Sequence, residues 1–156
     1  GTQSIVGKKS KPIDNEEDTS SSVIDKIGDK FQSDLVKVEL KGMRGKYFKT
    51  EDNTKFIVIL TSKYYENRKC YWYGLRQNQI KFLSENSTSY LVLVCGSSKN
   101  IFIQKWSDFK PNLKVLNTSD KGDKMYYHIR IFIRDSNFIL GLPEFRNSKD
   151  VSESFL

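Results

Sequence analysis

The apolar residues of this chain are concentrated in short runs of β-branched and aromatic side chains, which favour a fold built around a β-sheet. The run at residues 55–62 is apolar throughout its centre, which is typical of a strand buried on both faces. The runs at 90–95 and 100–103 are separated by a Gly/Ser-rich stretch that is typical of a turn. We therefore expect a buried strand followed, later in the chain, by a hairpin.

Residues 125–141 predict a second hairpin, with Asp135 and Ser136 at its turn. The first strand of this hairpin alternates between two sets of side chains, which should lie on opposite faces of the sheet. One face carries Tyr127, Ile129, Ile131 and Ile133, and the other carries Tyr126, His128, Arg130, Phe132 and Arg134.

Three helices are predicted around these strands. Apolar residues recur at steps of three and four between Ile24 and Val38, which predicts an amphipathic helix over about residues 22–42. A similar stripe predicts a second helix at 76–86, and a short third helix is expected within 104–116. Each of these helices has an apolar face that can cover a sheet.

Residues 70–75, with the sequence CYWYGL, are predicted to form a hairpin with the strand at 55–62. The order of helix, hairpin, helix, hairpin, helix and hairpin then predicts an α+β fold, with a mixed sheet of about six strands and two or three packing helices. We expect this domain to span residues 23–145. The polar segment 1–22 predicts a disordered linker or tag remnant, and 146–156 a C-terminal tail.

The charge of the chain favours polyanionic partners. It contains 26 Lys and Arg residues against 19 Asp and Glu residues, which gives a formal net charge of +7. A solvated lysine-rich surface without a partner is the alternative explanation. No apolar run is long enough for a membrane helix and no signal-peptide pattern is present, so we expect a cytoplasmic protein that does not bind membranes.

The sequence lacks the motifs of common catalytic sites. It contains neither the Gly-x-Ser-x-Gly nucleophile motif nor a glycine-rich phosphate loop. His128 is the single histidine, and we expect it to have a structural or ligand-contact role. Cys70 and Cys95 lie in apolar runs without metal-ligand spacing, so we expect buried reduced thiols, although a disulfide between neighbouring strands stays open. We therefore expect no catalytic residue, metal site or cofactor.

The three consecutive aromatic residues of CYWYGL cannot form one stacking surface, because strand alternation separates Trp72 from Tyr71 and Tyr73. Either Trp72 lies in the core and the tyrosines are exposed, or the tyrosines pack inward and Trp72 faces a groove. We favour the core position for Trp72, since aromatic residues in strands usually pack. In the second arrangement, Trp72 and Tyr64 or Tyr65 could hold an extruded base.

Basic and aromatic residues around Gly42 and Gly45, near CYWYGL and in the last hairpin are the candidates for contacts with DNA. Lysine and arginine would neutralise phosphates, which provides most of the affinity that does not depend on sequence. The candidates for DNA binding are Arg44, Lys46, Lys63, Arg68, Lys69, Trp72, Arg76, Arg130 and Arg134. The candidates for base contacts are Tyr64, Tyr65, Trp72, Tyr126 and His128.

Four features follow one another in the chain: the apolar run that ends at Lys63, the Tyr-Trp-Tyr-Gly strand, the following helix and the later strands. Their order resembles the layout of restriction-endonuclease-like domains of the PD-(D/E)xK superfamily. The resemblance covers about residues 50–110. Such enzymes hold a divalent ion between carboxylates, whereas the matching positions here are Val58 and Leu60. The resemblance therefore implies a domain that does not cut DNA and that contacts DNA or acts as a scaffold within a larger restriction or phage-defence protein.

The leading hypothesis is a non-catalytic domain that binds duplex DNA, through its sequence or a modified base, as part of a larger restriction or defence nuclease. One alternative is a metal-dependent nuclease with dispersed carboxylates such as Asp52, Glu66 and Asp108. A protein-interaction domain that docks on an acidic partner is the other alternative. Binding to oligonucleotides, with and without Mg²⁺, distinguishes these hypotheses.

Overall fold

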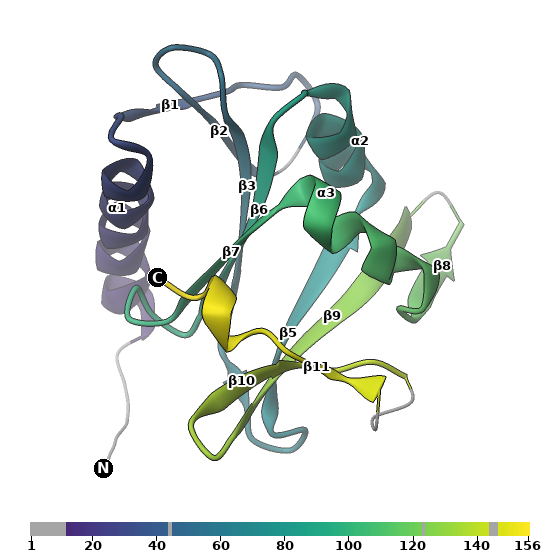
Figure 1. Cartoon of the computed structure of the whole chain (residues 1–156). Coiled ribbons are helices and arrows are strands. Elements are labelled where there is room, and N and C mark those ends of the chain that lie inside the picture. Colours follow the sequence, from purple (N-terminus) through teal and green to yellow (C-terminus); the bar gives the residue numbers. More distant parts are fainter. Residues whose placement is uncertain (1–11, 44, 123, 144–146) are drawn as a thin grey trace.

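The computed structural model describes residues 12–43, 45–122, 124–143 and 147–156, which form an α+β fold with two β-sheets (Figure 1). The helices are α1 (Pro12–Phe31), α2 (Gln77–Glu85) and α3 (Trp106–Phe109), and 3-10 turns follow at Lys110–Lys114 and Ser152–Ser154. The strands are β1 (Leu35–Lys37), β2 (Lys46–Thr50), β3 (Phe56–Ser62), β4 (Tyr64–Tyr65), β5 (Cys70–Arg76), β6 (Ser89–Cys95), β7 (Ile101–Lys105), β8 (Thr118–Lys121), β9 (Lys124–Arg134), β10 (Asn137–Leu140) and β11 (Lys149–Asp150).

The first sheet has five strands in the order β1-β2-β3-β6-β7. Its first three strands are antiparallel neighbours, β3 and β6 run parallel, and β7 returns antiparallel to β6. The parallel pair requires a long crossover, and the chain between β3 and β6 supplies it by forming β4, β5 and α2. β3 is thus buried in the centre of the sheet, as its continuous apolar run predicts.

The second sheet is organised around the long strand β9. One edge of β9 pairs with β5, which pairs in turn with the short strand β4. The other edge pairs with β8 near its start and with β10 near its end, and β11 extends the sheet beyond β10. The sequence analysis predicted one sheet of about six strands, whereas the chain forms two sheets with more strands.

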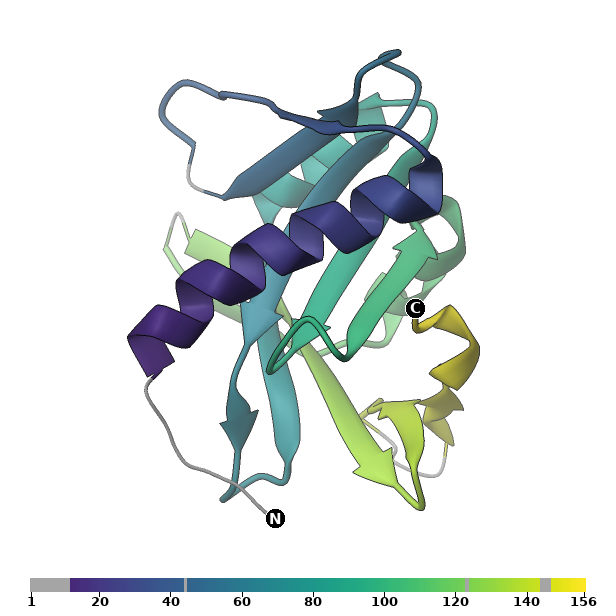
Figure 2. The same cartoon turned by 90° about the vertical axis from the view of Figure 1, so that its left-hand side faces the viewer.

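Three layers bury two apolar cores. Figure 2 shows α1 lying across one face of the five-stranded sheet, where Val23 and Ile27 pack on Ile57 and Val92. The other face of that sheet packs against the second sheet together with α2 and α3, and this larger core includes Tyr73. The second sheet therefore has one face in the core and one face away from it.

The first helix lies earlier in the chain than the periodicity predicts. α1 begins at Pro12, within the segment expected to be a disordered linker, and ends at Phe31 rather than near Gly42. Gln32 adopts a positive φ of 53°, and the Ser33 amide donates to the Gly28 carbonyl, which closes the helix. Leu35 and Val38 continue the apolar spacing of the helix by coincidence. Leu35 lies in β1, and Val38 follows that strand.

The predicted hairpin between 55–62 and 70–75 is wrong. β3 is hydrogen-bonded to β2 on one edge and to β6 on the other, so neither edge is left for β5. The chain instead leaves the first sheet at Ser62, whose hydroxyl accepts a hydrogen bond from the Trp72 amide at 3.0 Å. β5 therefore belongs to the second sheet and packs across the core from β3.

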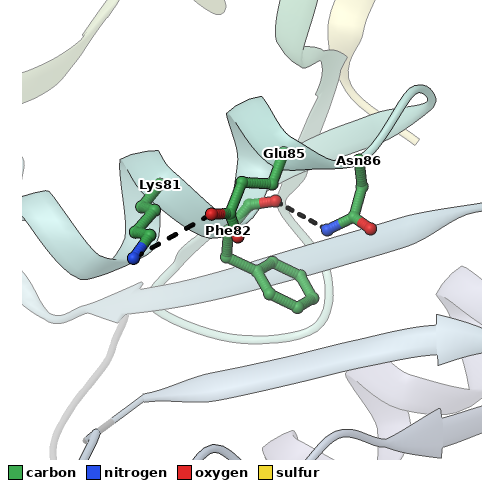
Figure 3. A network of polar contacts seen from close by, with 4 residues as sticks. All are labelled: Lys81, Phe82, Glu85 and Asn86. Atoms are coloured by element: carbon green, nitrogen blue, oxygen red, sulfur yellow. Dashed lines mark hydrogen bonds and ion pairs between the residues drawn. The ribbon is translucent and has the colours of Figure 1, made fainter.

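The segment expected to be a C-terminal tail packs on the fold, because β11 pairs with β10 and Val151 is buried in the larger core. The two other predicted hairpins and the two later helices are confirmed. The hairpin of β6 and β7 and the hairpin of β9 and β10 both form, and Asp135 and Ser136 turn the second one with positive φ angles. The helix at 104–116 forms as α3 and a 3-10 turn. α2 forms where its stripe predicts, and Figure 3 shows the ion pair of Lys81 with Glu85 and the Asn86 side chain donating to the Phe82 carbonyl at 2.8 Å.

Candidate functional site

The outer face of the second sheet carries most of the residues expected to contact a ligand. In β5, Tyr71, Tyr73 and Leu75 point into the core, whereas Trp72 and Gly74 alternate with them on the outer face and are half-buried. The expectation that Trp72 is a core residue is therefore wrong. The tyrosines fill the gap between the two sheets, so alternation places the tryptophan outside.

Strand pairing brings Trp72 next to the polar face of β9. Gly74 lies opposite His128, and Trp72 lies opposite Arg130. The Trp72 ring meets the Tyr126 ring edge-on at a centroid distance of 6.0 Å, and the His128 ring at 5.6 Å. Half-buried Trp72, Tyr126 and His128 thus form one aromatic cluster on the outer face.

Gly74 makes room for this cluster. A Cβ atom at this position would lie 3.1 Å from the Trp72 ring and 3.2 Å from the Tyr126 ring, closer than most Cβ contacts. The absence of a side chain therefore lets both rings lie over the backbone of β5.

A chain of hydrogen bonds fixes the cluster. Trp72 Nε1 donates to His128 Nδ1 at 2.9 Å, and His128 Nε2 lies 2.6 Å from the Ser119 hydroxyl. The indole nitrogen can only donate, so Nδ1 must accept and the neutral ring must carry its proton on Nε2. His128 therefore donates to Ser119, and the Ser119 proton is left to donate elsewhere.

The charge state of His128 agrees with this arrangement. Burial and the nearby Arg130 and Arg68 guanidinium groups lower the pKa of His128 below its ordinary value. Because Nε2 carries the proton, His128 cannot accept a proton from Ser119. The serine–histidine contact is therefore a structural pair and not an activated nucleophile.

An open cleft lies beside the cluster, between the outer face and the segment that joins β4 to β5. We call it the aromatic cleft; its volume is about 710 Å³. Lys63 lies over the Tyr65 ring at 5.2 Å and, with Arg68, makes the rim basic. The lining residues are Lys63, Tyr64, Tyr65, Glu66, Asn67, Arg68, Trp72, Tyr126 and His128.

A second open cleft of about 960 Å³ adjoins the first. We call it the basic cleft, because Arg76, Lys121 and Lys124 line it together with the first residues of α2, Gln77 and Asn78. Tyr65, Trp72 and Tyr126 line both clefts and form the wall between them. The two clefts thus make one continuous surface around Trp72.

The structure brings together most, but not all, of the predicted site residues. The aromatic cleft gathers all five base-contact candidates, along with Lys63 and Arg68, and the basic cleft gathers Arg76. The remaining DNA-binding candidates among the described residues line neither cleft, and Arg44 lies outside the described residues. These remaining candidates are Lys46 at the start of β2, Lys69 in the turn before β5, and Arg130 and Arg134 on β9.

Sequence analysis missed three polar residues of the site, Ser119, Lys121 and Lys124. They belong to β8 and to the start of β9, a hairpin that turns at Gly122 with a φ of 73°. The glycine between two short polar segments is the signal that predicts such a turn. β8 lacks apolar residues, so hydrophobic alternation could not reveal it.

The carboxylates of the alternative nuclease hypothesis do not converge. Asp52 lies in the turn between β2 and β3, where hydrogen bonds from Thr54 and Thr50 lower its pKa to about 2. Glu66 lies in the aromatic cleft and Asp108 in α3. Within the described ranges, no three His, Cys, Asp or Glu side chains are grouped so that they could hold a metal ion.

Both cysteines are free and buried. Tyr73 donates its hydroxyl proton to the Val94 carbonyl at 2.9 Å and lies 3.2 Å from Cys95 Sγ. Burial raises the pKa of Cys95 to about 11 and also raises that of Cys70. Neither thiol has the lowered pKa of a reactive cysteine.

None of the helices among the described residues combines the length and the apolar character that crossing a membrane requires.

No protein-family model matches the chain, and no curated protein or solved structure matches it either.

Proposed function

We propose that this protein is a non-catalytic DNA-binding domain that contacts DNA through the outer face of its second sheet. The observation that carries the proposal is the aromatic cleft, where Trp72, Tyr126 and His128 lie beside the basic side chains of Lys63 and Arg68. Aromatic faces that stack on bases, with cations placed for phosphates, are the two components of nucleic-acid surfaces of this kind.

The hydrogen-bond network of the aromatic cluster fixes the side chains that a base would meet in the cleft. The Ser119 hydroxyl accepts from His128 and keeps its own proton for donation. Burial and the neighbouring guanidinium groups lower the pKa of His128, which favours the neutral ring that its hydrogen bond with Trp72 requires. Charge therefore comes from the rim, and the aromatic cluster itself is neutral.

The resemblance to restriction-endonuclease-like domains supports a place for this domain within a larger restriction or defence protein in the cytoplasm. β3, β5, α2, β6 and β7 follow one another in the order of that layout. Val58 and Leu60 occupy the positions where such enzymes carry carboxylates, and Val58 is buried in the core. The absence of carboxylates at these two positions is consistent with a domain that recognises DNA without cutting it.

Fluorescence anisotropy with labelled oligonucleotides tests the proposal. Duplex, single-stranded and cytosine-modified oligonucleotides are each titrated at 50 mM and 200 mM salt, with and without Mg²⁺. If three phosphates are neutralised, the fourfold rise in salt should weaken duplex binding about 40-fold. The proposal fails if no oligonucleotide shows salt-dependent binding, and Mg²⁺-dependent cleavage would show an enzyme instead.

A paired variant assigns the binding to the cleft. Replacing Lys63 and Arg68 by Gln removes the two cations of the rim and should weaken binding to every oligonucleotide, with a smaller salt dependence. Replacing Lys26 and Lys30 by Gln is the control, because it removes the same number of charges from exposed positions on α1, which packs on the first sheet at the face away from the second sheet. Equal losses in both variants would show that only net charge matters.

A further inference from the structure

The basic cleft has the charge of an anion subsite. Arg76 comes from the end of β5, and Lys121 and Lys124 flank the turn between β8 and β9, so segments far apart in the chain supply the three cations. The described residues that line this cleft include no carboxylate. This one-sided charge is favourable for a phosphate group and unfavourable for a cation.

The start of α2 adds to this field. Gln77 and Asn78 form the first turn of the nine-residue helix and line the cleft. The buried Gln79 side chain accepts the Arg76 amide proton at 2.8 Å, which fixes the path of the chain as it enters the helix. The positive end of the helix dipole therefore acts beside the three cationic side chains.

The wall between the clefts presents aromatic surface to both sides. Tyr65, Trp72 and Tyr126 line each cleft, so a ligand bound in one of them lies next to the other. His128 holds the Trp72 ring by its indole nitrogen, and Gly74 leaves room for it. The ring is thus held in place before any ligand binds, which reduces the ordering cost of binding.

We propose that the two clefts together bind one unstacked nucleotide of DNA, with its base in the aromatic cleft and its phosphate in the basic cleft. The inference rests on the proposed DNA-binding function and specifies the form of DNA that this surface takes. In an intact duplex, each base face is covered by its neighbours, so a base can contact Trp72 only after it leaves the stack. The protein therefore prefers single strands and duplexes with an unpaired base over intact duplexes.

Competing oligonucleotides of equal length and flanking sequence test the preference by anisotropy. The set contains an intact duplex, the same duplex with one mismatched pair, and the single strand. The mismatched duplex and the single strand should each bind about tenfold more tightly than the intact duplex, since stacking of one base is worth about that factor. Equal affinity for all three would overturn the inference while leaving DNA binding in place, whereas no salt-dependent binding to any of them would refute the proposed function.

Two substitutions of Trp72 separate stacking from fold stability. Trp72→Leu removes the aromatic face and should reduce the preference for the mismatched duplex over the intact duplex to less than about twofold. Trp72→Phe keeps an aromatic face without the indole N–H group and should retain most of the preference. Loss of the preference in both variants, or in neither, would contradict a stacking role for this residue.

The basic cleft is tested by replacing Lys121 and Lys124 with Gln. We expect weaker binding to all three oligonucleotides and a salt slope that is smaller by about one to two. The preference for the unpaired base should survive, because Trp72 is unchanged. Unaltered affinity and salt slope would show that no phosphate binds in the basic cleft.

Intrinsic fluorescence gives an independent measurement. The chain has two tryptophans, and Trp106 is buried in the core near α2, where its Nε1 atom donates to Ser84. In a Trp106→Phe variant, Trp72 is the only tryptophan, and excitation at the red edge of the absorption band selects it over the tyrosines. Its emission should be quenched by the mismatched duplex and by the single strand, and to a much smaller extent by the intact duplex. Equal quenching by all three would contradict binding of an unstacked base.

Discussion

Trp72 donates its indole proton to His128 across the β5–β9 pair, at 2.9 Å, and this contact determines which nitrogen of the histidine is protonated. The imidazole then donates from Nε2 to Ser119. Protonation of His128 would place a second N–H group against the indole N–H group, and the hydrogen bond would be lost. The orientation of the most exposed tryptophan is thus coupled to the charge of the only histidine.

The stability of the fold should decrease as the pH falls through the titration of His128. Burial, Arg130 and Arg68 lower the pKa of this group in the folded protein, so between its folded and unfolded pKa values the unfolded chain binds more protons. The stabilisation is complete above the ordinary histidine pKa of about 6.5 and is lost as the pH falls through the lowered folded value. Melting temperatures measured from pH 7.5 to pH 5 should show this decrease.

A His128→Gln variant is the control for this titration, since glutamine can accept the Trp72 proton but does not titrate. As the pH falls from 7.5 to 5, the melting temperature of the wild-type protein should decrease relative to that of the variant. A histidine NMR signal that titrates at or above pH 6.5, or that shows Nδ1 protonated at neutral pH, would contradict the arrangement. The single histidine makes its signals easy to assign.

Gly74→Ala should disturb the aromatic cluster more than the fold. The added Cβ would lie 3.1 Å from the Trp72 ring and 3.2 Å from the Tyr126 ring, so at least one ring must move by a few tenths of an ångström. We expect a loss of about 1 kcal/mol in the free energy of unfolding, together with a shift in Trp72 emission. Urea denaturation and fluorescence of the Trp106→Phe background measure the two effects, and unchanged emission would show that the rings do not depend on the glycine.

Periodicity alone could predict three features of the structure. They are the hairpin of β9 and β10, helix α2, and the shared face of Tyr126 and His128. Alternation also limited CYWYGL to two arrangements, but the choice between them depends on the second sheet. β5 belongs to that sheet because β2 and β6 occupy both edges of β3, and such long-range pairing has no local signal. The basic cleft was missed for a similar reason, because Lys121 and Lys124 reach Arg76 only through the pairing of β8, β9 and β5.

Both cysteines should be unreactive in the folded protein. Burial raises the pKa of Cys95 to about 11 and raises the pKa of Cys70, so little thiolate is present at neutral pH. A thiol reagent such as DTNB should modify neither residue in native buffer and both of them after unfolding in urea. Rapid modification of one thiol in the native protein would show that the sheet carrying that residue, the second for Cys70 and the first for Cys95, opens locally there.

Tyr73→Phe should destabilise the fold by about 1 kcal/mol, because it removes the hydrogen bond from this buried hydroxyl to the Val94 carbonyl. Tyr90→Phe is the matched control: Tyr90 lies on the same strand as Val94, is half-buried, and would keep its ring contact with Phe31. The control should change the free energy of unfolding by less than about 0.5 kcal/mol. Urea denaturation compares the two variants, and equal losses would mean that the Tyr73 hydroxyl does not link the two sheets as the structure shows.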